Sequence, residues 1–187
     1  MSAYQNTGAV INGILKVLVV AGMAGTAVIA PNAVQLGEPI LKYLDKRGRK
    51  KELNRVLKYM DQRSLSNFKE LPDGQLIVTI TEKGRRRVEK INFDEMRIDQ
   101  PVKWDRKWRL VMFDIPEFRR KYRSAFSRKL RSLGLYQMQK SVWVCPYPCL
   151  REIQITKQVL GIPDVELAFA ELSFIDREVE LRKHFNL

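Results

Sequence analysis

The sequence is poor in metal-binding side chains. Its 187 residues include two cysteines, Cys145 and Cys149, and a single histidine, His184. A zinc site built from cysteine and histidine needs four ligands, so one chain cannot assemble it from these residues. Because disulfides are rare in the cytoplasm, we expect both cysteines to be reduced in a cytoplasmic protein. We also expect no required cofactor.

Acidic residues are scarce as well. The chain has 21 aspartates and glutamates against 34 lysines and arginines, a formal net charge of +13. Residues 46–58 carry seven basic side chains and one acidic, and residues 103–131 carry eleven against three. Such blocks predict a polyanion-binding surface, and we expect double-stranded DNA as the partner. The alternative is a solvated face that aids solubility.

Long apolar runs are limited to one segment, residues 8–30, which is interrupted by Asn12, Lys16 and Thr26. Its length of about 20 residues suffices to cross a bilayer. A secretory signal is not favoured, because no positive charge precedes it. We favour a buried helix, or two short ones, within an N-terminal segment of residues 1–35. In the alternative, the segment tethers the protein to a membrane with the domains in the cytoplasm.

The order of helical and strand patterns in residues 36–92 predicts a winged helix-turn-helix domain. A short helix around residues 40–44 precedes a second helix whose Leu53, Val56, Leu57 and Met60 recur at helical spacing. Strands at residues 67–70 and 75–81 flank a turn, and Thr81 caps a short closing helix. In a winged helix the exposed helix enters the major groove and the hairpin contacts the backbone. The predicted DNA-binding residues here are Arg49, Lys50, Asn54, Arg55, Lys58, Tyr59, Arg85 and Arg86. An ordinary small α+β domain with a basic surface is the alternative.

An acidic, proline-containing linker is expected at residues 93–103, followed by a second domain at residues 104–187. Its pattern predicts strands at 107–113, 135–140, 141–145 and 165–173, with helices at 118–133, 150–160 and 177–185. This βαββαβ order is ferredoxin-like, with an additional C-terminal helix. The predicted fold class of the chain is therefore α+β.

Asp114 lies where the first strand of this domain ends, before a helix rich in arginine. Three of these arginines, Arg119, Arg120 and Arg123, are further predicted DNA-binding residues. For Asp114 we favour helix capping or ion pairing. Catalysis through a metal ion is the alternative. Trp108 and Trp143 are interpreted as core or interface residues rather than platforms for base stacking.

The run from Trp108 to Glu117 (WRLVMFDIPE), the basic helix and the later run QKSVWV at residues 139–144 resemble a known module. They are similar to the ferredoxin-like domain of the CRISPR-associated spacer-acquisition protein Cas-two. They resemble more closely the central domain of PaaX-type phenylacetate-degradation repressors, which join a winged helix to that module. Across the Cas-two family the aspartate matching Asp114 is the proposed metal-binding residue of a dimeric nuclease. PaaX-type repressors carry a further C-terminal domain, so acyl-CoA sensing is not carried over to this sequence.

The favoured function is a repressor-like DNA-binding transcriptional regulator that forms a homodimer through the Cas-two-like domain. One alternative is a Mg²⁺-dependent endonuclease of the Cas-two type that uses Asp114 as its metal-binding and catalytic residue. Another is a non-catalytic DNA-binding scaffold for a CRISPR-adaptation-like complex.

Overall fold

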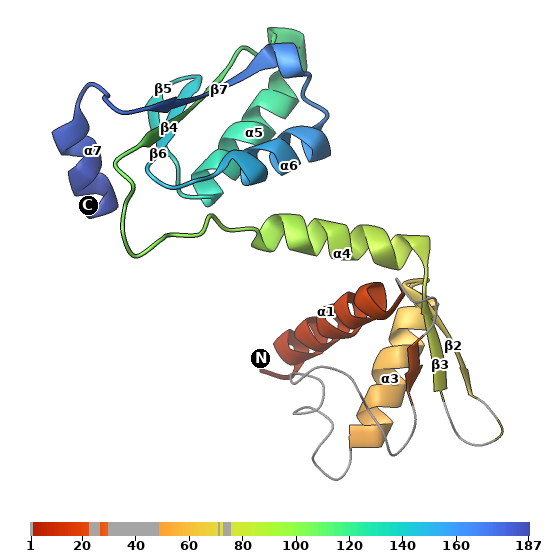
Figure 1. The fold of residues 1–187 in the computed structure, drawn as a ribbon. Helices are drawn as coiled ribbons and strands as arrows, with labels where there is room; N and C mark the ends of the chain where they lie inside the picture. The colour runs from red at the N-terminus through yellow and green to blue at the C-terminus, as the bar shows by residue number, and fades with distance from the viewer. Residues whose placement is uncertain (1, 23–26, 30–48, 71, 73–75) are drawn as a thin grey trace. The chain divides into compact units, whose positions relative to one another are not determined.

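A computed structural model describes residues 2–22, 27–29, 49–70, 72 and 76–187 (Figure 1). The chain divides into two compact units, Met1–Asp94 and Glu95–Leu187. The helix that closes the first unit extends to Glu95 and so takes in the first residues of the expected linker. Each unit is described by itself.

The first unit combines three helices with a small antiparallel sheet in the part of it that the structure describes. Its elements are α1 (Ser2–Gly22), β1 (Ala27–Ile29), α3 (Arg49–Gln62), β2 (Ser66–Glu70), β3 (Leu76–Ile80) and α4 (Glu82–Glu95). The sheet order is β1-β3-β2, and in the β2–β3 hairpin Ser66 lies opposite Ile80. The two predicted hairpin strands are therefore confirmed. The predicted helix at residues 40–44 lies outside the described residues, as does most of the hairpin turn.

The apolar N-terminal segment forms one helix that supplies much of the core of the first unit. Ile11, Ile14, Leu15 and Leu18 of α1 are buried in one cluster with residues of α3 and of the sheet. The predicted burial of this segment is confirmed for α1. None of the helices within the described ranges is long and apolar enough to cross a membrane.

Thr81 directly precedes α4 and caps it, as the sequence predicts. Its Oγ1 accepts a hydrogen bond from the backbone N–H of Gly84 at 3.1 Å and donates one to the carbonyl of Ser64 at 2.6 Å. Gly84 is required here because a Cβ at this position would lie 2.1 Å from the carbonyl oxygen of Leu65. The start of α4 is thus pressed against the chain that connects α3 to β2.

The second unit has the ferredoxin-like arrangement that the sequence predicts. Its elements are β4 (Trp108–Phe113), η1 (Glu117–Arg119), α5 (Arg120–Ser132), β5 (Tyr136–Gln139), β6 (Val142–Cys145), α6 (Leu150–Leu160), η2 (Asp164–Glu166), β7 (Leu167–Leu172) and α7 (Glu178–Phe185). The sheet is antiparallel in the order β5-β6-β4-β7, so β6 lies between the strands that α5 connects. This is the split βαβ topology of the ferredoxin-like fold.

Helices cover both faces of this sheet (Figure 1). On one face α5 and α6 bury Phe126, Leu130 and Ile153 against Val111 and Trp143. Trp143 is 1% exposed, so it belongs to the core and is not free to stack on a base.

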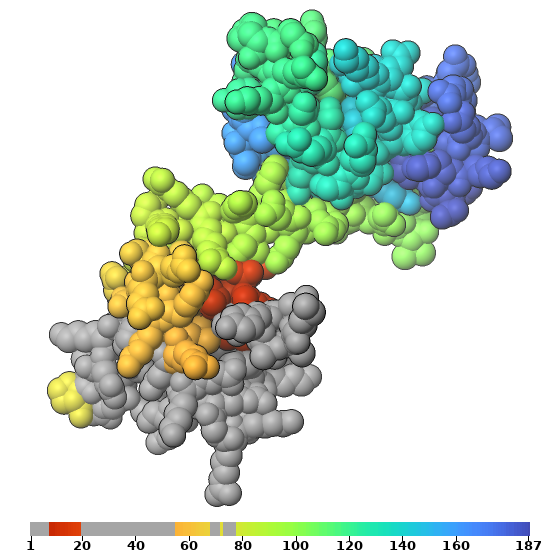
Figure 2. Space-filling view, turned by 180° about the vertical axis from the view of Figure 1, so that it is seen from behind, coloured from red at the N-terminus to blue at the C-terminus, as the bar shows by residue number. Residues whose placement is uncertain are grey.

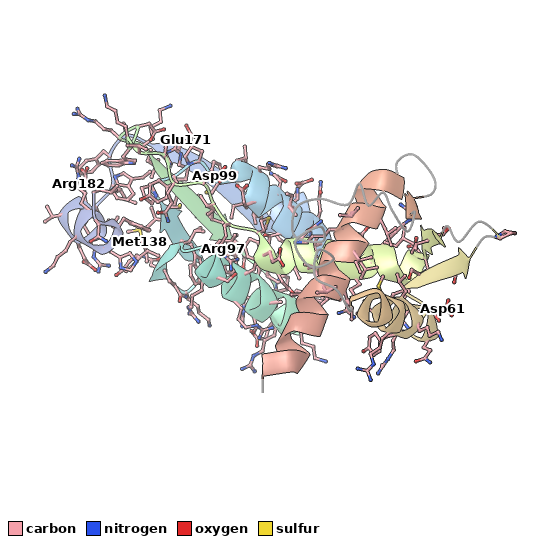
Figure 3. All side chains as sticks on the ribbon, turned by 90° about the horizontal axis from the view of Figure 1, so that it is seen from below. Asp61, Arg97, Asp99, Met138, Glu171 and Arg182 are labelled. Carbon is pink, nitrogen blue, oxygen red and sulfur yellow. The ribbon has the colours of Figure 1, made fainter. Side chains whose placement is uncertain are left out.

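The other face of the sheet is packed by α7. Leu181 of this helix joins Trp108 and Val144 in a separate buried cluster. Arg182 projects from α7 (Figure 3), and its guanidinium carbon lies 4.8 Å from the ring centroid of Trp104. Trp108 is 0% exposed. The interpretation of Trp108 and Trp143 as core residues is therefore confirmed.

Candidate nucleic-acid surfaces

The first candidate surface lies on α3. Helical spacing turns Val56, Leu57 and Met60 into the core, where each is at most 2% exposed. The same spacing directs Arg55 and Lys58 to solvent. Tyr59 is 39% exposed, and the guanidinium of Arg63 lies over its ring, 5.3 Å from the centroid. We call Arg55, Lys58 and Tyr59 the α3 outer face.

The α3 outer face combines the side chains that suit a nucleic acid. Arginine and lysine contact phosphates and guanine edges, and a tyrosine hydroxyl can bond a phosphate oxygen. Side chains around Asp61 project from this helix in Figure 3. Three further predicted residues belong to α3, but the structure does not describe their side chains: Arg49, Lys50 and Asn54.

The basic residues of α4 have unequal environments. Arg86 is exposed and pairs with Glu82 at 3.1 Å, one turn earlier on the same helix. Arg85 is half-buried. Arg87 donates a hydrogen bond to the Oδ1 of Asn12 at 3.2 Å and so links α4 to α1. Because exposed ion pairs of this kind contribute little stability, Arg86 can exchange its partner for a phosphate at small cost.

The second candidate surface lies on α5, which contains six basic residues and no acidic one. Arg120, Lys121, Arg128 and Arg131 are exposed. At 3.6 residues per turn these four positions fall within an arc of about 100°. We call them the α5 stripe. Residues of α5 form part of the surface of the second unit in the space-filling view (Figure 2).

Two of the three arginines predicted to bind DNA in this region, Arg119 of η1 and Arg123 of α5, form ion pairs with carboxylates. Arg119 donates to both carboxylate oxygens of Glu166 at 2.6 Å and to the carbonyl of Gly161 at 2.7 Å. Arg123 pairs with Glu117 at 2.7 Å, and its side chain is 21% exposed. DNA binding by Arg119 and Arg123 stays a prediction, and these ion pairs weaken it. The side chain of Arg120 is 75% exposed, and its ion pair with Glu117 is longer, at 3.9 Å.

Sequence reasoning omitted Lys121, Arg128 and Arg131 from the predicted site, although the spacing of the α5 stripe could have found them. Positions 120, 128 and 131 recur at helical intervals on the side opposite Phe126 and Leu130. Arg123 lies about 60° from Arg120 around the helix axis, outside the arc of the α5 stripe.

The charge at the start of α5 is unfavourable for the helix itself. The first turn carries Arg120 and Lys121, no acidic residue and no side-chain cap. The N-terminus of a helix is the positive end of its dipole, so each cation there costs roughly 0.3–1 kcal/mol at low ionic strength. Glu117 in the preceding η1 lies 3.9 Å from Arg120 and offsets part of this cost, and a bound polyanion would offset more of it.

Asp114 is exposed and does not cap the helix that follows. Its backbone N–H donates to the carbonyl of Glu166 at 2.9 Å. The caps of η1 and α5 are Pro116 and Arg119, and neither makes a side-chain capping bond. Within the described residues the Asp114 carboxylate has no ion pair either, so the prediction of capping or pairing is wrong.

The surroundings of Asp114 do not fit a metal ion within one chain. The nearby carboxylates of Glu166 and Glu117 are taken up by Arg119 and Arg123. In the portion of the chain that the structure covers, no group of three His, Cys, Asp or Glu side chains could hold a metal. Mg²⁺ is usually held by one or two carboxylates together with waters and substrate phosphates, and Asp114 would supply one such carboxylate from each chain.

The fold and surfaces of the second unit define it as a basic ferredoxin-like domain. Residues 101–179 match the family described as the PaaX protein central Cas2-like domain. The predicted resemblance is thus confirmed for this unit, and the chain is consistent with a PaaX-type protein. A comparison with curated proteins found no match.

Proposed function

We propose that this protein is a DNA-binding transcriptional regulator of the PaaX type whose first unit is a winged helix. The order of α1, β1, α3 and the β2–β3 hairpin supports this proposal, because α3 directly precedes the hairpin, as a recognition helix does. The observation that carries it is the division of α3: Val56, Leu57 and Met60 are buried while Arg55 and Lys58 are exposed.

In this proposal the second unit joins two copies of the chain. A two-fold dimer presents two reading helices to a near-palindromic operator. The match to the PaaX central domain is consistent with a regulator. Sedimentation equilibrium of the full chain tests the dimer directly, and a monomer at micromolar concentration contradicts this part of the proposal.

Binding of a fluorescent duplex to the full chain tests the main proposal. If about 6–10 phosphates are contacted, affinity falls by roughly 10³-fold or more between about 50 and 200 mM salt. Lys58→Glu is expected to weaken binding by about 1–3 kcal/mol, the scale of a single contact. Lys140→Glu, at an exposed position in the turn between β5 and β6, makes the same charge change and serves as the control. A salt slope near zero, or equal losses in both variants, contradicts the assignment.

The α5 stripe favours a second candidate function, a scaffold that holds DNA without reading its sequence. Its four exposed cations suit backbone phosphates, which carry no sequence information directly. The two functions differ in specificity. A regulator selects particular duplexes from a random pool, whereas a scaffold binds all of them with similar affinity.

A further inference from the structure

The only two cysteines of the chain frame one short connection in the second unit. Cys145 is the last residue of β6, and Cys149 is the N-cap residue of α6. Pro146 and Pro148 lie between them, and each ring fixes its φ near −65°. The connection therefore has few conformations, and the thiols at its two ends interact with each other.

The two thiols are free and buried, and the sulfur of Cys145 accepts a hydrogen bond from the backbone. Their residues are 2% and 1% exposed. The backbone N–H of Tyr147 donates to the Sγ of Cys145 at 3.5 Å. Arg109 lies opposite Cys145 across the β4–β6 pair, and its Nη1 donates to the carbonyl of Pro146 at 2.8 Å. Both cysteines also belong to the buried apolar cluster on this face of the sheet.

These neighbours make the two sulfurs unequal. The Cys149 thiol, then the N–H of Tyr147 and the charge of Arg109, lower the pKa of Cys145 against the opposing effect of burial. The interaction with Cys145 and burial raise the pKa of Cys149. Cys145 is therefore the sulfur that more readily becomes a thiolate, the nucleophilic form. Cys149 retains its proton and lies next to it.

We propose that Cys145 and Cys149 form a dithiol that hydrogen peroxide converts into an intrachain disulfide, with Cys145 as the attacking sulfur and Cys149 as the resolving one. This modification site does not depend on the proposed DNA-binding function. The burial of both residues restricts the oxidant to a small molecule and excludes bulky disulfides such as oxidised glutathione. Because both thiols are buried, the reaction is slower than that of an exposed thiolate.

The chemistry balances in two steps. The Cys145 thiolate attacks one peroxide oxygen, the O–O bond breaks, and the departing hydroxide takes up the thiol proton as water. Cys145 is then a sulfenic acid. The Cys149 sulfur attacks the sulfenic sulfur, the S–S bond forms, and the S–O bond breaks to release a second water. The two sulfurs together lose two electrons, which the peroxide gains.

Peptide mass spectrometry of the full chain tests the proposal. After peroxide treatment, free thiols are alkylated in denaturant and the chain is cut with trypsin, which leaves both cysteines in the peptide of residues 141–151. In the wild type this peptide is expected to lose two hydrogens, to resist alkylation, and to recover both thiols after dithiothreitol. Two alkylatable thiols remaining after treatment, or a disulfide between chains, would overturn the proposal.

Single variants test the assignment of roles. Cys149→Ser is expected to accumulate a sulfenic acid at Cys145 that reacts with dimedone. Cys145→Ser is expected to slow oxidation of the remaining thiol at least tenfold. Equal oxidation rates in the two variants would overturn the assignment of Cys145 as the attacking sulfur. The wild-type measurement decides whether the disulfide forms even if a variant fails to fold.

Discussion

The two units carry their positive charge differently. In the first unit Arg55 and Lys58 extend from α3 into solvent while the core beneath them is apolar. In the second unit Arg109 is buried and held by Asp105 and Glu171, at 2.5 and 3.2 Å. Arg119 there is fixed by Glu166 in the same way. The second unit therefore uses part of its basic excess to hold its own fold together.

This difference shows that a count of basic residues overstates a binding surface. A guanidinium group taken out of water must be paired, because an unpaired buried charge is strongly destabilising. Paired arginines such as Arg119 then have less charge to offer a phosphate. In the second unit the exposed cations of the α5 stripe remain available for binding.

Gly84→Ala is expected to have the largest effect on stability, and only in the first unit. The added Cβ would lie 2.1 Å from a backbone carbonyl, so α4 must shift. We expect destabilisation at the upper end of about 1–3 kcal/mol, which outweighs the gain of roughly 1 kcal/mol in helix propensity. All three tryptophans, Trp104, Trp108 and Trp143, lie in the second unit. Urea unfolding should therefore shift by circular dichroism but not by tryptophan fluorescence.

Gly8→Ala is the matched control for this substitution. Gly8 lies in α1, and a Cβ there would meet nothing within 4 Å. We expect this change to be neutral or slightly stabilising. Equal destabilisation by both substitutions would show that the close approach of position 84 to the Leu65 carbonyl does not cause the loss of stability.

Asp105→Asn is expected to destabilise the second unit alone, by about 1–2 kcal/mol at neutral pH. This is less than for a fully buried pair, because the Asp105 side chain is 43% exposed and Glu171 still faces Arg109. The hydrogen bond from Arg109 lowers the pKa of Asp105 to about 2. The wild-type contribution is therefore complete above the unfolded pKa of about 4 and is lost as the pH falls through about 2. Fluorescence-detected unfolding at several pH values should show the two proteins converging in acid, and a constant difference would contradict this account.

Arg128→Glu in the α5 stripe is expected to weaken DNA binding by about 1 kcal/mol and to reduce the salt slope by about one. Arg151→Glu, at an exposed position on α6, makes the same charge change outside the stripe and should have less effect. Anisotropy titrations of both variants over a range of salt measure this. If Arg151→Glu weakens binding as much, net charge rather than the stripe is responsible.

Asp114→Asn is expected to have the smallest effect on stability, within about 0.5 kcal/mol, because the side chain is exposed and caps no helix. Thermal unfolding of the variant checks this. The same variant tests the nuclease alternative: DNA cleavage that needs Mg²⁺ and is lost in Asp114→Asn, but not in Asp176→Asn at another exposed aspartate, would support it.

Local pattern was enough to place most elements of the second unit. The predicted helix at residues 150–160 coincides with α6, and the predicted first strand differs from β4 by one residue. Both succeed because apolar residues recur there at the period of the element, and Pro116 and Gly161 mark ends nearby. The sequence likewise indicated the inward side of α3 and the cap at Thr81, since both depend on residues within a few positions.

The tertiary structure decided which charges are available. Arg119 and Glu166 are 47 residues apart in the chain, and no local pattern links them before the sheet brings η1 and η2 together. The same holds for Asp114, which stands beside an arginine-rich helix in the sequence yet makes no ion pair within the described residues. Periodicity determines which side of an element is buried, because it follows from backbone geometry. Which charged groups meet across that surface depends on the packing of distant segments.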